Sequence, residues 1–112
     1  MTGMLFLLSA AALHGAGGKL PPYAESIRCA GLAEAATEAA TDRAEERRLF
    51  DAAIFWGMAA SEAARKAKYP GERFTADQLS AAAAAKTELV APAPGARAEL
   101  AACLDRVPRL RR

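Results

Sequence analysis

Few residue types in this chain can do chemistry, and two cysteines are the most informative of them. Cys29 and Cys103 form an even pair in a chain of 112 residues, and each falls on the apolar face of a predicted helix. In a small exported domain such a pair more often forms a disulfide than remains as thiols. We therefore predict a Cys29–Cys103 disulfide. Two buried and inert thiols are the alternative.

The other groups that could support acid–base or metal chemistry do not form a recognisable site. The only histidine, His14, lies in a predicted signal peptide, so the mature domain has no imidazole for general-base catalysis or zinc binding. There is no Cys-x-x-Cys motif, glycine-rich phosphate loop or G-x-S-x-G sequence. The glutamate pairs Glu34/Glu38 and Glu45/Glu46 have alanine and arginine neighbours, which favours a solvated charged strip. We predict that the protein is not an enzyme and uses no metal or cofactor.

The N-terminal residues have the pattern of an export signal. Residues 4–13 form an uncharged apolar run of about ten residues, which is the length of a signal-peptide core and about half that of a membrane-spanning helix. Small residues follow, and we place cleavage after Gly17 or Gly18. The three residues before the apolar run contain no lysine or arginine. A buried N-terminal helix of a cytosolic protein is the alternative.

These features divide the chain into four parts. We predict a signal peptide at residues 1–17, a linker at 18–22, a helical domain at 23–107 and a basic tail at 108–112, with a periplasmic or secreted location. The net charge of +2 is too balanced for a nucleic-acid-binding domain as a whole.

The composition predicts an all-α fold with a weak core. Hydrophobic residues make up 53% of the chain, but more than half of them are alanine, which has the highest helix propensity and buries little area. A disulfide closing a loop of about 75 residues would add roughly 4 to 4.5 kcal/mol in the chain-entropy description. We predict a small three- to four-helix bundle whose first and last helices are joined by that disulfide.

Four helices are expected in the domain. The first covers about residues 23–41 and the second about 44–68, with a break at Asp42, which can cap the second helix together with Glu45. A single helix over residues 23–68 is the alternative, but it would be about 69 Å long. Large apolar residues cover more than half of the second helix, so we place it in the middle of the bundle, with Gly57 as a point of close backbone approach.

The third and fourth helices have clearer boundaries. Thr75 and Gln78 form a capping-box pattern at the start of the third helix, whose apolar stripe contains Leu79, Leu89 and Val90. Pro92, Pro94 and Gly95 then predict a loop. The last helix spans residues 96–107, and its apolar stripe is formed by Ala96, Leu100, Cys103, Leu104 and Val107.

Two features could mediate binding. Phe55 points about 140° away from Phe50 around the second helix, so that one compact core cannot easily cover both. Phe55 and its neighbour Trp56 are therefore candidate contact residues, although the last helix or the tail could instead cover Phe55. The tail residues Arg109, Arg111 and Arg112 could touch an acidic partner or anionic headgroups.

The predicted function is that of a non-catalytic exported helical protein that acts through protein contacts. Its overall plan, with one disulfide between distant helices, resembles that of periplasmic acid-stress chaperones in architecture alone, which implies a structural or stress role but assigns no residue. The partner would be an unknown protein or a second copy, with no nucleic acid, no membrane span and at most weak surface contact with lipid. The alternatives are a small carrier of an apolar ligand and a cytosolic helical interaction protein.

Overall fold

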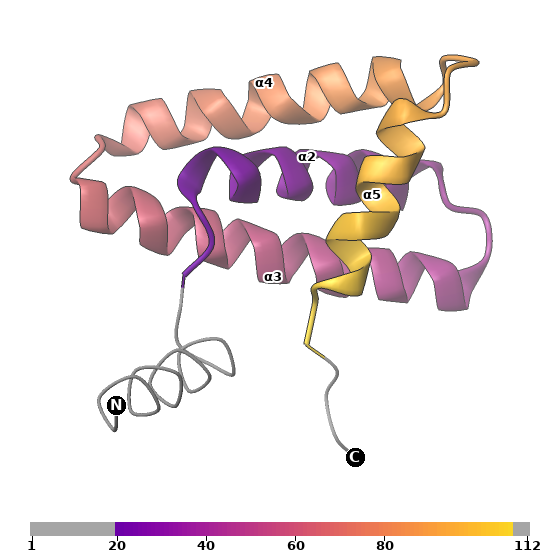
Figure 1. Ribbon diagram of the computed structural model, residues 1–112, viewed down its shortest axis with the longest axis horizontal. Helices are drawn as coiled ribbons and strands as arrows, with labels where there is room; N and C mark the ends of the chain where they lie inside the picture. Colours follow the sequence, from indigo (N-terminus) through magenta and orange to yellow (C-terminus); the bar gives the residue numbers. More distant parts are fainter. Residues whose placement is uncertain (1–19, 109–112) are drawn as a thin grey trace, which may run out of the picture.

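The computed structural model describes residues 20–108, and the regular secondary structure of that range consists of helices (Figure 1). Helix α2 spans Tyr23–Ala39, α3 spans Arg43–Ala67, α4 spans Gly71–Leu89 and α5 spans Gly95–Asp105. The predicted all-α bundle is therefore confirmed. The predicted signal peptide and the tail residues 109–112 lie outside the described residues.

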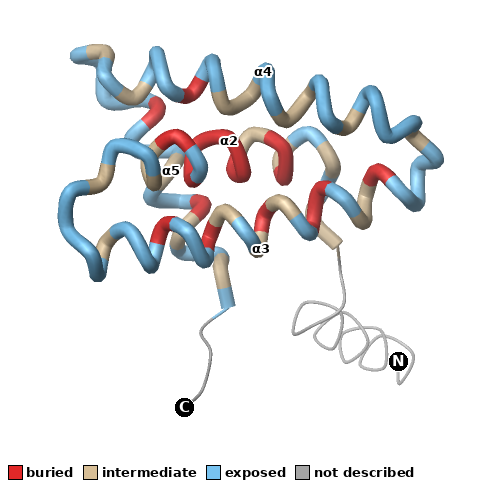
Figure 2. Tube along the Cα trace, turned by 180° about the vertical axis from the view of Figure 1, so that it is seen from behind, coloured by how far each residue is buried: buried red, intermediate tan, exposed pale blue. Residues whose placement is uncertain are grey.

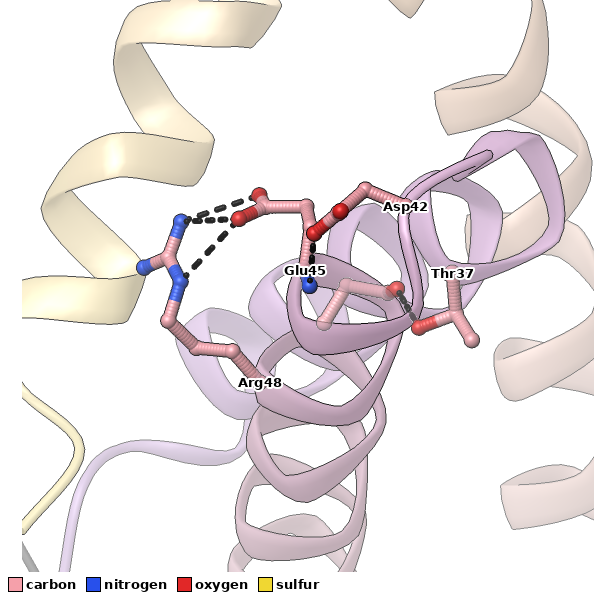
Figure 3. A network of polar contacts seen from close by, with 5 residues as sticks. Thr37, Asp42, Glu45 and Arg48 are labelled. Carbon is pink, nitrogen blue, oxygen red and sulfur yellow. Dashed lines mark hydrogen bonds and ion pairs between the residues drawn. The ribbon is translucent and has the colours of Figure 1, made fainter.

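The chain breaks between α2 and α3 at the predicted place. The Asp42 carboxylate accepts a hydrogen bond of 2.9 Å from the backbone N–H of Glu45, and the Glu45 carboxylate in turn binds Arg48 at 2.9 Å (Figure 3). At the end of α2, the Thr37 hydroxyl donates to the carbonyl of Ala33 at 2.7 Å. The cap satisfies one of the free N–H groups at the start of α3. Residues 23–67 therefore form two helices and not one.

Helix α2, and not α3, lies in the middle of the bundle. It packs between α3 and α4, and it has more buried residues than any other described helix (Figure 2). The prediction that placed the second helix at the centre is wrong, because small residues on α2 allow neighbouring backbones to approach on both sides. The buried residues of α2 are Ser26, Ile27, Cys29, Ala30, Gly31, Leu32, Ala33 and Ala35.

The close backbone approach occurs at Gly31 of α2. A Cβ atom at this position would lie 2.7 Å from the carbonyl carbon and oxygen of Ala81 on α4, which is closer than any ordinary contact. The prediction for Gly57 is wrong, since a Cβ atom there would meet nothing within 4 Å. Gly57 lies on the flank of α3 that no described neighbour covers.

Helix α4 begins earlier than predicted, and fewer of its apolar side chains are buried than predicted. Lys68 ends α3 in a left-handed conformation with φ of 63°, and α4 starts at Gly71 after Pro70, without a side-chain cap. The prediction that a Thr75–Gln78 capping box starts this helix is therefore wrong, because the helix begins one turn earlier, after Pro70. The predicted apolar stripe is also wrong in part, since Leu79 and Val90 are 67% and 79% exposed.

Small residues replace that stripe at the contact between α4 and α2. Ala85 is fully buried, and Ala81 faces Gly31. Leu89 is half-buried against the core. Alanines on α4 can therefore reach the α2 backbone more closely than leucine or valine side chains could.

Helix α5 runs across α2 and is held there by the disulfide (Figure 1). The Cα atoms of Cys29 and Cys103 are 5.7 Å apart, within the range typical of disulfides, so the predicted bond is confirmed. Ala96 and Cys103 are buried, while Leu100, Leu104 and Val107 are half-buried against the core, as predicted for the last helix.

Polar contacts surround the disulfide. The indole N–H of Trp56 donates to the carbonyl of Cys103 at 3.2 Å, and the Arg106 guanidinium lies 5.0 Å from the centroid of the Trp56 ring. Arg28 pairs with Glu88 of α4 at 2.7 Å and with Glu99 of α5 at 2.5 Å. The hydrogen bond from Arg28 holds the pKa of Glu99 below its usual range. Arg28 thus joins α2 to both α4 and α5 by charge, and the disulfide joins α2 to α5 as well.

An aromatic cluster joins the start of α2 to the start of α4. The Tyr23 hydroxyl donates to Asp77 at 2.8 Å, and the Arg73 guanidinium stacks 3.7 Å from the centroid of the Tyr69 ring. Burial, together with the hydrogen bond to Asp77, raises the pKa of Tyr23 to about 12. Tyr23 therefore remains a neutral hydrogen-bond donor at physiological pH.

Candidate functional site

Three large apolar side chains on α3 are exposed to solvent along one line. Phe50 is 54% exposed, Ile54 is 48% exposed and Met58 is 68% exposed, and they follow one another at intervals of one helical turn. We call Phe50, Ile54 and Met58 the outer stripe. Single exposed apolar residues are common on protein surfaces, but an aligned set of three is a candidate contact surface.

The outer stripe is exposed because the core uses only the opposite side of α3. The residues of that side are buried against α2 and α5, and the described residues place no helix over the outer stripe. Apolar residues thus cover more of α3 than the bundle can bury. The buried residues of α3 are Leu49, Ala52, Trp56, Ala59, Ala60 and Ala64.

Charged residues continue the outer stripe at both ends. At the N-terminal end, the side chains of Arg43, Glu46, Arg47 and Phe50 line a shallow hollow of about 250 Å³. Its volume is below the roughly 300 to 1,000 Å³ typical of small-molecule pockets, so the hollow gives the carrier alternative no support. The hollow places the apolar ring of Phe50 beside two arginines and one glutamate.

At the C-terminal end, Glu62 and Arg65 form an ion pair one helical turn apart. The Arg65 guanidinium holds the pKa of Glu62 below its usual range, so the carboxylate stays ionised at neutral pH. The outer stripe therefore has two arginines before it and an acidic group after it along the same helix.

The structure separates the two aromatic candidates that the sequence placed together. Trp56 is 1% exposed and belongs to the core, so its prediction as a contact residue is wrong. Its indole N–H is satisfied by α5, which crosses α3 at this point. Phe55 is half-buried and packs edge-on against the Trp56 ring, with centroids 5.1 Å apart. Phe55 therefore lies at the edge of the core, and the more exposed apolar residues are those of the outer stripe.

The predicted contact residues of the tail, Arg109, Arg111 and Arg112, lie outside the described residues. The sequence contains the signal that identifies the outer stripe, namely the spacing of Phe50, Ile54 and Met58 in line with Arg43 and Arg47. That spacing alone does not distinguish an exposed face from a buried one.

Within residues 20–108, no group of three or more histidine, cysteine, aspartate or glutamate side chains could hold a metal ion. In the same range, no helix is both long and apolar enough to cross a bilayer. The shifted pKa values of Tyr23, Glu62 and Glu99 have structural causes, because each group is hydrogen-bonded to a neighbouring residue of the bundle.

Comparisons of the chain with known protein families, with characterised proteins and with solved structures find no match. The outer stripe is the largest aligned set of exposed apolar side chains in the described bundle.

Proposed function

We propose that the protein is an exported, non-catalytic helical module that binds another protein through the outer stripe of α3. The observation that carries the proposal is the exposure of Phe50, Ile54 and Met58 on a helix whose opposite side forms the core. Burying these side chains against a partner would remove apolar surface from water, which is the main favourable term in most protein associations.

The surroundings of the outer stripe support a protein partner. Protein interfaces commonly have an apolar centre with a polar rim, and they are enriched in phenylalanine, methionine and arginine. The outer stripe has this composition, since Arg43 and Arg47 lie directly beside Phe50. Because α3 presents a ridge and only a shallow hollow, we expect the partner to offer a groove or a helix face.

The disulfide supports an exported location. Disulfides persist in oxidising compartments and are rare in the cytosol. The Cys29–Cys103 bond joins α2 to α5 in the folded domain, and the apolar run of residues 4–13 has the length of a signal-peptide core. Together they favour a periplasmic or secreted module over the cytosolic alternative.

The proposal predicts that Ile54 is dispensable for folding and needed for binding. We expect Ile54→Ser to change the free energy of unfolding by no more than about 0.5 kcal/mol, because the side chain is exposed. A photo-crosslinking residue in place of Ile54, in protein exported by its native host, should give one discrete adduct that mass spectrometry identifies as a protein. The adduct should disappear when Phe50→Ser and Met58→Ser are added.

The matched control carries the same photo-crosslinking residue at Ser80, an exposed position on α4. We expect no discrete adduct from it. Equal labelling from positions 54 and 80 would contradict the proposal, as would a loss of several kcal/mol of stability in Ile54→Ser, which would assign the side chain to the core.

A further inference from the structure

We propose that the partner of the outer stripe is a second copy of this chain, with the two α3 helices packed antiparallel about a two-fold axis at Ile54. This inference rests on the proposed function. The outer stripe is symmetric about its centre, since Phe50 and Met58 lie about 6 Å along the helix on either side of Ile54. In an antiparallel pair, Ile54 therefore meets the partner's Ile54, and Phe50 meets the partner's Met58. Two-fold contacts between identical surfaces are the commonest kind in homo-oligomers.

Gly57 provides the space that this arrangement requires. It lies on the same flank of the outer stripe as Phe50, and a Cβ atom there would meet nothing within 4 Å. The two-fold axis places this flank of one helix against the same flank of the other. Along the helix axis, Phe50 and the partner's Gly57 are then offset by only about one residue. The Phe50 ring can therefore lie over the partner's glycine, while the flexible Met58 side chain adjusts to what remains.

One pair of charges beside the outer stripe is complementary in the same register. Arg47 lies opposite the partner's Ser61, one residue from the partner's Glu62 and on the same flank. The two-fold axis creates this Arg47–Glu62 pair twice. In the same register Arg43 lies opposite the partner's Arg65, and this like-charge pair at each end of the contact opposes dimerisation. The small net charge of +2 keeps long-range repulsion between copies weak.

The contact would be modest in size. Helix α3 has 25 residues and is about 37 Å long, and only its outward face is available. Such a helix pair belongs to the smaller class of interfaces, below about 1,200 Å² in total. We therefore expect a micromolar, concentration-dependent dimer.

Charge reversal tests the register directly. We expect Arg47→Glu and Glu62→Arg each to weaken dimerisation of the mature protein about tenfold in sedimentation experiments, because each places like charges together twice. An equimolar mixture of the two variants should recover the wild-type affinity, since each mixed dimer contains two opposite-charge pairs. The matched controls Lys86→Glu and Glu72→Arg reverse exposed charges on α4, away from the outer stripe, and should dimerise like the wild type.

The outcomes separate the two proposals. A dimer whose charge variants do not recover on mixing would overturn the antiparallel register. A strictly monomeric wild type, together with a crosslink from position 54 to a different protein, would overturn self-association and leave the proposed function intact. A monomer that gives no discrete crosslink from position 54 would overturn both. Circular dichroism confirms that each variant is folded before it is compared.

Discussion

Replacing both cysteines with alanine is expected to lower the free energy of unfolding by about 4 kcal/mol. The disulfide closes a loop across a sequence separation of 74 residues, and a loop of this length gives a stabilisation of that size in the chain-entropy description. Only Ala96 and Cys103 of α5 are buried, while Leu100, Leu104 and Val107 are half-buried against the core, so this short helix depends strongly on the disulfide. For a domain whose total stability is about 5 to 15 kcal/mol, the loss would be large.

The fluorescence of Trp56 can show which part of the bundle loses stability when the disulfide is removed. Its indole ring is buried, and it donates a hydrogen bond to Cys103 of α5. In denaturant titrations of Cys29→Ala/Cys103→Ala, we expect a lower midpoint and an early red shift of tryptophan fluorescence, because α5 separates from α3 first. Alanine is chosen because it leaves no unsatisfied polar group in the core. Reduced wild-type protein should behave in the same way. A midpoint equal to that of the oxidised protein would show that the disulfide does not support the fold.

The second large effect is expected at Gly31. Alanine at a helix interior position normally stabilises by up to about 1 kcal/mol relative to glycine. In Gly31→Ala, however, the new methyl group would lie 2.7 Å from backbone atoms of Ala81, so α2 and α4 must move apart. We expect a net loss of about 1 to 3 kcal/mol, measured by thermal or denaturant unfolding.

Gly57→Ala is the matched control, since it makes the same change inside a helix where nothing lies within 4 Å. We expect it to be neutral or stabilising by up to about 1 kcal/mol. If Gly31→Ala were as stable as Gly57→Ala, the tight α2–α4 contact would be absent and the central position of α2 would be wrong.

The parts of the fold that follow from local chemistry could be predicted from the sequence. The break at Asp42 depends on one side chain and a nearby N–H group, and it forms as expected. The disulfide and the apolar stripe of α5 were also predictable, because Leu100, Cys103 and Leu104 recur at helical spacing within a short segment between two prolines. The capping pattern at Thr75 is equally local, but it does not start the helix, because α4 already begins one turn earlier, after Pro70.

The order of the helices in the bundle could not be predicted in the same way. Alanine occurs on every face of these helices, so its pattern does not show which face is buried. The large residues of α3 suggested a central helix, whereas small residues on α2 allow backbones on two sides to approach it closely.

The same difficulty affects the candidate site. Phe50 and Phe55 are both phenylalanines on one helix, but Phe55 packs against the buried Trp56 ring whereas Phe50 is 54% exposed. Trp56 in turn is hydrogen-bonded to α5, which the disulfide joins to α2, so that its burial depends on residues far apart in the sequence. Periodicity within α3 cannot supply this information.

The central claim is that this chain is an exported module held together by one disulfide, and the intact mass of the protein from its native compartment tests it most directly. We expect a chain that begins near Gly18 or Lys19, with a mass lower by two hydrogen atoms than that of the reduced form. Retention of Met1, together with two free thiols at Cys29 and Cys103, would contradict both parts of the claim.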